Sequence, residues 1–412
     1  MYFHLSFLIS LFYFYHMITH RSLFLRHLAQ TSDTPLALEI EKASGIYMYT
    51  TEGKAILDLI SGIAVSNVGH CHPAVVKAVQ QQSETYMHLM VYGELIQSPQ
   101  VVLAAAIVKT LPEPLDRVYF VNSGSEAVEG ALKLAKRFTG RRHLISCTNA
   151  YHGSSHGALS VMGHEFFKQA FRPLLPGISS IRFGQEEDLH YINEQTAAVI
   201  IEPIQGEAGV VMAEASYFKA LAKRCKETGC LLIFDEIQSG FGRTGTFWFI
   251  EQLGVTPDIL VCAKGMGGGM PIGAFISSSE IMRTLTHDPF LGHITTFGGH
   301  PVSCAASLAT LQTILSEELH LKASAKEKLF RSTLRHASIL EIRGTGLMMA
   351  IELGDAGKVQ RTIAKALEKG LLTDWFLFKD TALRLAPPLT ITEEEIKKAC
   401  VILLESLDEA RS

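Results

Sequence analysis

Short apolar runs alternate with amphipathic stretches between about residues 100 and 300. Residues 125–138 place Val128, Ala131, Leu132 and Ala135 at helical spacing, ending with Phe138. Such alternation predicts a large, mostly parallel β-sheet covered by helices. The expected strands are "RVYFV" (117–121), "HLISC" (143–147), "AAVII" (197–201), "CLLIF" (230–234), "DILVC" (258–262) and "GAFIS" (273–277).

The pattern changes after residue 301. A long helical stretch is followed by short strands around 342–353 and 382–388, and then by a helix opened by a capping box from Thr392 to Glu395. We therefore expect an α/β protein with a second, smaller α+β domain. The predicted parts are an N-terminal extension (1–34), a segment packing with the small domain (35–65), a large domain (66–300) and a small C-terminal domain (301–412).

The first eighteen residues are strongly apolar and aromatic. They resemble a signal-peptide core, but no Lys or Arg precedes them and no small-residue cleavage site follows. As a membrane span they are shorter than the roughly 20 residues required, and they contain His4 and His16. Three readings stay open: a start at Met17, a targeting segment, or a buried arm. No stable membrane association is expected.

Composition and charge exclude several classes of function. Of the 412 residues, 47% are apolar and 19% charged, as in compact enzymes, and the net charge of −4 argues against nucleic-acid binding. The basic stretch "KRFTGRR" (136–142) is expected to be a solvated helix end. Seven scattered cysteines, with no C-x-x-C pair, favour neither disulfides nor zinc and indicate a cytoplasmic location. The "HCH" at 70–72 is interpreted as a turn before Pro73, so no metal site is predicted.

Polar residues follow several of the predicted strands, and ligands collect at the carboxyl ends of strands in such sheets. In "YFVNSGSEAVEGALK", the strand runs through Ser123, Gly124 and Ser125 into a helix. The free N–H groups of that first turn could bind an anion, although an ordinary N-cap would have the same sequence.

Two carboxylates and one lysine end other strands. Asp235 ends "LLIFD" and precedes Gln238, while Glu207 stands in a glycine-flanked loop after Glu202. Lys264 follows "DILVC" and precedes a glycine-rich loop. Alone, each residue has a purely structural explanation. Together, an anion seat, a buried carboxylate and a strand-end lysine are what pyridoxal phosphate requires, because the carboxylate keeps the pyridine nitrogen protonated and the lysine forms the imine.

Several segments occur in the order found in class III aminotransferases, which this chain resembles from about residue 35 onward. They are "SGIAVSNVGHCHP", "SGSEAVEGALKLAKR", "YHG", "EPIQGEAGV", "DEIQSGFGRTG", "AKGMGGGMPIGA", "TTFGGHP" and "LRLAPPL". The similarity is to the acetylornithine, ornithine and putrescine aminotransferase branch. It implies the fold type I architecture, with 66–300 as the cofactor-binding domain, and a homodimer with active sites at the subunit interface.

The resemblance also implies roles for individual residues. Lys264 matches the Schiff-base lysine and Asp235 the partner of the pyridine nitrogen. Gln238 matches the residue at the ring hydroxyl and Tyr151 the ring that stacks on the cofactor. The remaining cofactor residues are Gly124 and Ser125 at the phosphate and Thr296, which serves the phosphate of the other subunit.

The substrate residues implied by the resemblance are Arg384, which clamps a carboxylate, and Glu207, which covers this arginine when the donor has no carboxylate there. Thr295 is also expected to contact the substrate. Ser154 stands where acetylornithine and ornithine aminotransferases carry an arginine, so the donor is less defined than the enzyme class; Arg172 is another cation that could serve instead.

The expected reaction is a ping-pong transfer of a terminal amino group from an amine or ornithine-type donor to 2-oxoglutarate. Acetylornithine, ornithine, 4-aminobutyrate and putrescine remain alternative donors. A nicotinamide dehydrogenase would need G-x-G-x-x-G opening a helix, but Met270 and Pro271 interrupt that pattern. A catalytically silent cofactor-binding homologue would be expected to lack Lys264 or Asp235, and both are present.

Overall fold

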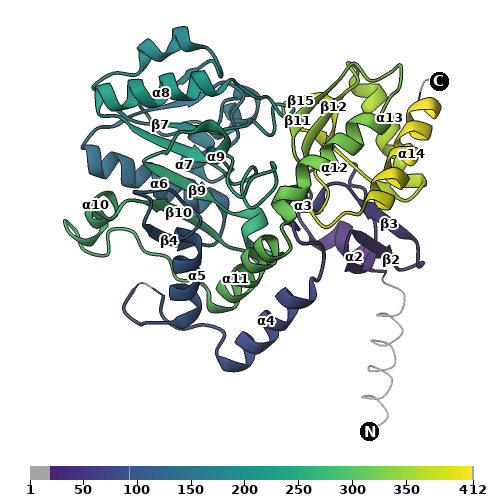
Figure 1. Ribbon diagram of the computed structural model, residues 1–412, viewed down its shortest axis with the longest axis horizontal. Helices are drawn as coiled ribbons and strands as arrows, with labels where there is room; N and C mark the ends of the chain where they lie inside the picture. The colour runs from purple at the N-terminus through teal and green to yellow at the C-terminus, as the bar shows by residue number, and fades with distance from the viewer. Residues whose placement is uncertain (1–18, 92, 411–412) are drawn as a thin grey trace, which may run out of the picture.

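The computed structural model describes residues 19–91 and 93–410. Two lobes lie side by side in Figure 1, one built around a large sheet and one around smaller sheets near the C-terminus. The predictions for residues 1–16 fall outside the described residues.

The large sheet has seven strands in the order β4-β10-β9-β8-β7-β5-β6. Neighbours from β9 to β6 are parallel, whereas β10 is antiparallel to both β4 and β9. The mostly parallel sheet predicted from the sequence is thereby confirmed. Its strands are β4 (Arg117–Val121), β5 (His143–Cys147), β6 (Ile178–Ile181), β7 (Thr196–Ile201), β8 (Leu231–Asp235), β9 (Ile259–Cys262) and β10 (Gly273–Ser277).

Helices cover both faces of this sheet. Successive strand residues point to opposite faces, so Ala198 and Ile200 pack in the cluster that includes α6, whereas Val199 and Ile201 pack in the cluster that includes α5 and α8. Every residue of β7, β8, β9 and β10 is buried. The helices around this sheet are α4 (Pro73–Thr85), α5 (Ser98–Val108), α6 (Gly124–Thr139), α7 (His156–Ser160), α8 (Ala215–Thr228), α9 (Ile250–Leu253), α10 (Ser279–Met282) and α11 (Pro301–Ser316).

The smaller lobe contains the sheet β11-β12-β15-β14, whose strands are all antiparallel. Its last helix starts with the predicted capping box between Thr392 and Glu395. The small α+β domain expected after residue 301 is therefore present. Its elements are α12 (Leu319–Thr333), β11 (Glu341–Thr345), β12 (Met348–Glu352), α13 (Ala356–Glu368), β13 (Leu371–Leu372), β14 (Trp375–Phe376), β15 (Lys379–Leu385) and α14 (Glu393–Glu409).

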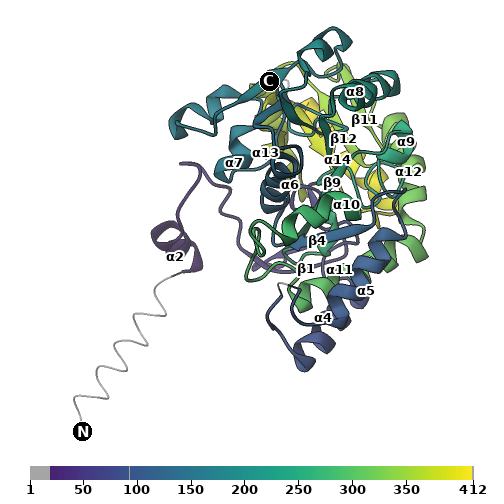
Figure 2. The ribbon, with the colours of Figure 1, turned by 90° about the vertical axis from the view of Figure 1, so that its left-hand side faces the viewer.

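The N-terminal strands join this lobe rather than the large sheet. They form the sheet β1-β2-β3-β13, in which β3 pairs in parallel with β13. In Figure 2, α2 (His20–His27) stands away from the body, and none of its residues is buried. The exact domain boundaries stay a prediction. The N-terminal elements are β1 (Ile40–Ser44), β2 (Tyr47–Thr50), β3 (Ala55–Asp58) and α3 (Ser61–Ala64).

The two motifs expected to be structural have local explanations. In "HCH", the His72 side chain accepts a hydrogen bond from Ala74 N and caps α4, while His70 pairs with Asp58 at 2.8 Å. In "KRFTGRR", α6 ends at Thr139 with Gly140 as its C-cap, and Arg141 then donates to two backbone carbonyls. This stretch is thus a helix end, but Arg141 is half-buried and bonded rather than solvated.

Within residues 19–91 and 93–410, no helix combines the length and apolar character needed to cross a membrane. All seven cysteines are free thiols, and only Cys71 is exposed.

Candidate active site

The carboxyl ends of β4, β7, β8 and β9 lie along one edge of the large sheet, where they open onto a cavity of about 410 Å³. Residues far apart in the sequence meet here because strand ends of parallel sheets share an edge. Seven of the predicted site residues line this cavity: Gly124, Ser125, Tyr151, Glu207, Asp235, Gln238 and Lys264.

Lys264 starts a 3₁₀ turn directly after β9, with φ of 48°. This left-handed conformation is unusual for a side-chain-bearing residue and costs about 1–3 kcal/mol, so the surrounding structure must hold it in place. Among the described residues, the Lys264 amine has no hydrogen-bond partner. Burial lowers the pKa of Lys264, and the negative charge of Glu207 opposes that shift. A lowered pKa favours the neutral, nucleophilic amine.

The glycines after Lys264 allow other elements to approach closely. A Cβ on Gly265 would lie 2.3 Å from Asn67 Nδ2, and one on Gly268, where φ is +60°, would lie 2.1 Å from Thr310 Oγ1 on α11. The loop is therefore packed against α11 and the segment after α3, which holds the lysine in a defined position.

The N-terminus of α6 faces the same cavity. Ser123 is the N-cap, and its hydroxyl accepts a hydrogen bond from Glu126 N. The amides of Gly124 and Ser125 have no acceptor among the described residues, and both residues line the cavity. Ser125 Oγ accepts from Ser154 N at 3.2 Å. The N-cap interpretation is confirmed for Ser123, and the next two amides are unpaired, as an anion seat would require.

Asp235 lies at the end of β8 and is only 5% exposed. Its Oδ2 is 2.7 Å from His152 Nδ1, and its Oδ1 accepts from Ile237 N. Glu202 at the end of β7 accepts hydrogen bonds from the amides of Tyr151 and Gly206. Burial raises the pKa of Glu202 to about 7, with His152 opposing and Asp235 adding to the rise.

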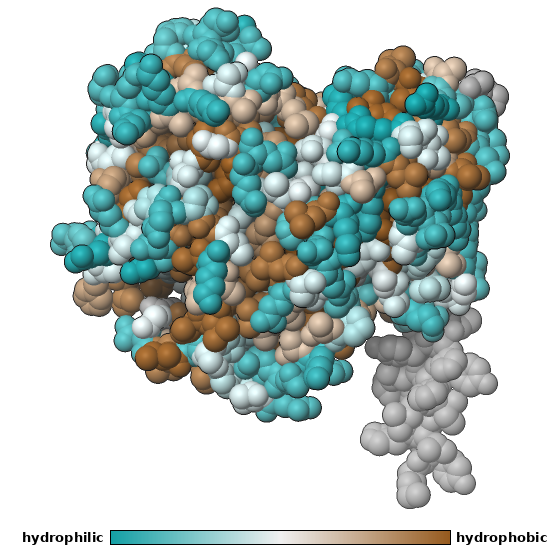
Figure 3. Space-filling view, viewed as in Figure 1, coloured by the Kyte–Doolittle hydropathy of each residue, from teal (hydrophilic) through white to brown (hydrophobic). Residues whose placement is uncertain are grey.

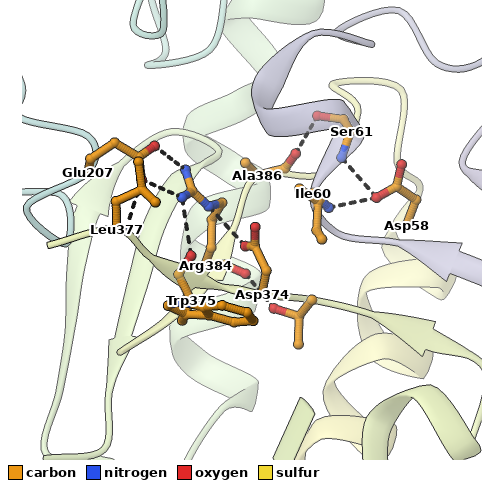
Figure 4. Close-up of polar contacts among 10 residues, drawn as sticks. Asp58, Ile60, Ser61, Glu207, Asp374, Trp375, Leu377, Arg384 and Ala386 are labelled. Carbon is orange, nitrogen blue, oxygen red and sulfur yellow. Dashed lines mark hydrogen bonds and ion pairs between the residues drawn. The ribbon is translucent and has the colours of Figure 1, made fainter. Parts of the chain in front are cut away.

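Arg384 on β15 reaches from the small domain to Glu207. Its Nη1 and Nη2 donate to the two carboxylate oxygens of Glu207 at 3.0 and 2.9 Å (Figure 4). Burial alone would raise the pKa of Glu207, but the charge and hydrogen bonds of Arg384 outweigh it and hold that pKa below its usual value. Glu207 also accepts from Leu377 N and is held in a tight loop bridged by Gln205 and Val211.

Ser154 lies beside the rim of the cavity, with its hydroxyl 3.3 Å from that of Tyr151. Arg172, the alternative cation, makes two hydrogen bonds to Glu165 at 2.9 and 2.8 Å and is therefore already paired. The ring of Phe378 lies 6.3 Å from the Tyr151 ring and stacks on His164 at 4.8 Å. Ser154, Tyr151 and Phe378 thus present hydroxyl groups and aromatic rings here.

Thr295 and Thr296 precede α11 and do not line the cavity. Thr295 Oγ1 accepts from Asn122 Nδ2, which brings it next to a lining residue. Thr296 is exposed.

Sequence reasoning missed His152 and Asp374. His152 lies inside "YHG" but was not among the predicted site residues, because only the fold brings it to Asp235. Asp374 belongs to none of the sequence motifs. Its carboxylate accepts a hydrogen bond from Arg384 Nε at 2.9 Å. Burial is the main cause of the raised pKa of Asp374, and this burial depends on the packed fold.

The large mixed sheet and the smaller α+β domain have the architecture of fold type I pyridoxal phosphate-dependent transferases. The model of the family "Aminotransferase class-III" matches residues 28–407. An acetylornithine aminotransferase from Methanopyrus kandleri is 40% identical over 368 residues, covering 88% of this chain and 92% of the relative. Another, from Methanocaldococcus jannaschii, is 40% identical over 387 residues and covers 91% and 93%.

Solved structures agree with these relatives. The ornithine aminotransferase from Toxoplasma gondii superimposes with a TM-score of 0.89 at 28% identity, covering 98% of both chains. The adenosylmethionine-8-amino-7-oxononanoate aminotransferase from Methanocaldococcus jannaschii gives a TM-score of 0.87 at 30% identity, covering 94% of this chain and 98% of that one. The chain belongs to the class III aminotransferase family, and the predicted enzyme class and fold are confirmed.

Proposed function

We propose that this enzyme transfers the terminal amino group of an ω-amine or ornithine-type donor to 2-oxoglutarate, with pyridoxal phosphate as its cofactor. The observation that carries this proposal is the bidentate pair of Glu207 and Arg384 beside Lys264. An uncovered Arg384 would bind a carboxylate next to the reacting amine, as an α-amino acid requires. With Glu207 on it, the site accepts an amine that has no carboxylate at that position.

The residues present fit the cofactor at two points, the N-terminus of α6 and the carboxylate of Asp235. The two free amides at the N-terminus of α6 suit a phosphate, because they add the positive end of the helix dipole to unpaired donors. The segment that carries Tyr151 packs closely against the N-terminus of α6, and glycine at position 153 permits this, since a Cβ there would lie 2.1 Å from Ser125 Oγ. The buried carboxylate of Asp235 suits a protonated ring nitrogen.

Within this arrangement each residue has a task. Lys264 would attach the cofactor, and its free amine would later move the proton from the donor carbon. His152 orients Asp235 through the 2.7 Å contact. Gln238 and Tyr151 would contact the ring hydroxyl and the ring face. When bound, the cofactor supplies an electron sink that stabilises negative charge on the substrate carbon.

The far end of the donor would lie near Ser154 and Phe378. A neutral hydroxyl and an aromatic ring bind a distal carboxylate less well than the arginine found in the arginine-bearing relatives, and Arg172 is paired with Glu165. We therefore expect broad use of ω-amines, with acetylornithine accepted but not sharply preferred.

A homodimer completes the proposal. Exposed apolar side chains gather in two segments, one around Ile96 and one around Phe290. The two segments meet at the contact between the rings of His88 and Phe297, 4.7 Å apart. Ile96 is 95% exposed and Phe290 75%, and Figure 3 shows hydrophobic surface at the lower left, in the area of α5. A patch of this kind is typical of a protein interface. Thr296 lies beside it and would reach the phosphate of the second subunit, in the cytoplasmic enzyme we expect.

A donor panel with 2-oxoglutarate as acceptor tests this function. Acetylornithine, ornithine, 4-aminobutyrate and putrescine should each give glutamate, at higher kcat/KM than alanine, which carries its amine next to a carboxylate. Faster turnover of alanine than of every terminal amine would show that Arg384 is not covered during the first half-reaction.

A further inference from the structure

Arg384 has a second carboxylate partner in addition to Glu207. Its Nε donates to Asp374 Oδ1 at 2.9 Å, on the opposite edge of the guanidinium from Glu207 (Figure 4). Arg384 is 3% exposed and Glu207 5%, whereas the Asp374 side chain is 21% exposed. One carboxylate would be enough to neutralise the charge of one arginine. The two carboxylates bind different edges of the guanidinium.

The two carboxylates come from different parts of the fold. Asp374 directly precedes β14 and is tied to Arg384 by a backbone bond of 2.8 Å from Arg384 N to Asp374 O. Glu207 belongs to the loop after β7, in the large domain. Departure of the Glu207 side chain would therefore leave Asp374 in place, because different parts of the fold hold the two carboxylates.

Other contacts within the same hairpin also hold the Arg384 guanidinium and backbone. The Trp375 carbonyl accepts from Nη2 at 3.2 Å, and the Phe376 ring lies 4.4 Å from Cζ. Thr373 donates its hydroxyl to the Arg384 carbonyl. Only the Nη1 and Nη2 edge faces the large domain, and a substrate carboxylate would have to bind there after Glu207 leaves.

We propose that Asp374 is a positioning residue for the acceptor: it holds the Nε edge of Arg384, so that the other edge stays directed at the cavity when a substrate carboxylate replaces Glu207. This inference rests on the proposed function. It means that the amine half-reaction does not need Asp374, whereas the 2-oxo acid half-reaction does.

Removal of Asp374 should therefore separate the two substrates. In Asp374→Ala, KM for 2-oxoglutarate should rise about tenfold or more, since a charge-assisted hydrogen bond is lost. The kcat/KM for 4-aminobutyrate should stay within about threefold, because that donor meets Arg384 already covered by Glu207. Asp374→Asn keeps a neutral acceptor and should show a smaller increase in the acceptor KM, of about threefold.

The pH dependence gives a signature that a purely structural role would not. Burial raises the pKa of Asp374 to about 6; the Arg384 charge opposes this rise, and Glu207 and Asp58 add to it. Because the pKa is raised, the carboxylate becomes protonated as pH falls through about 6. The wild-type KM for 2-oxoglutarate should then rise at low pH, whereas that of Asp374→Asn should lack this change.

The matched control is Asp380→Ala, which removes the same charge from an exposed position on β15. Calorimetry with glutarate, which has both carboxylates of 2-oxoglutarate but no 2-oxo group, measures binding without turnover, and melting temperatures report folding. Weaker glutarate binding by Asp374→Ala, with the control unchanged, supports the inference; equal loss for donor and acceptor, or no loss, overturns it. A wild-type protein that binds glutarate but transfers no amine refutes the proposed function instead.

Discussion

The two ends of the cavity are built in different ways. The cofactor end takes Gly124, Asp235 and Lys264 from positions at or just beyond the carboxyl ends of strands of one sheet. At the substrate end, Arg384 meets Glu207 across 177 positions of the sequence, from another domain. A single rigid sheet edge suits a cofactor that must stay in place, whereas a contact between two domains can open and close. We therefore expect substitutions at the cofactor end to abolish activity and those at the substrate end to change preference.

The largest effect is expected for Lys264→Ala. Without the amine, both the cofactor attachment and the proton transfer are lost, and kcat should fall by about 10⁴-fold or more. Steady-state assays with 4-aminobutyrate measure this. Retention of even a tenth of the activity would place the chemistry on another residue.

Asp235→Asn should follow, with a fall in kcat of about 10²- to 10³-fold, because the buried charge is removed while the shape is kept. The cofactor should still bind, as seen by its absorbance after gel filtration. Near-normal turnover would show that Asp235 only terminates β8 and holds Ile237 N.

Glu207→Gln sharpens the comparison, since it should alter preference more than rate. Replacing the carboxylate weakens the cover on Arg384, so glutamate should gain as amino donor relative to 4-aminobutyrate by about tenfold. The ratio of the two kcat/KM values is the measurement. An unchanged ratio would mean that the pair in Figure 4 does not open during catalysis.

The smallest effect is expected for Ser154→Arg. A charged hydrogen bond stabilises by about 1.5–3 kcal/mol, against about 0.5–1.5 for a neutral one, so acetylornithine should gain up to about tenfold over putrescine. Ser154→Ala is the matched control and should leave that ratio nearly unchanged. If the arginine variant behaves like the control, the distal carboxylate binds elsewhere.

Much of the cofactor end could be predicted from the sequence because its main residues lie within three positions of the end of an apolar strand run. Lys264, Asp235 and the α6 N-terminus were found this way, and the resemblance then gave them roles. The left-handed φ of Lys264 had no such signal, because it depends on α11 and Asn67 packing against the adjacent glycines.

The substrate end could be predicted only in part. The resemblance named Glu207 and Arg384, but Asp374 reaches Arg384 only through the pairing of β14 with β15. Similarly, His152 meets Asp235 across 83 positions. Contacts of this range depend on the packed fold rather than on local pattern. The antiparallel β10 within a parallel sheet is a further example.

Borohydride reduction of the cofactor-loaded enzyme, followed by peptide mapping, tests the central claim most directly. The account predicts one pyridoxyl adduct, on Lys264, and none on Lys326, whose pKa burial lowers to about 8 at a position outside the cavity. An adduct on any other lysine, or a protein that takes up no cofactor, would contradict it.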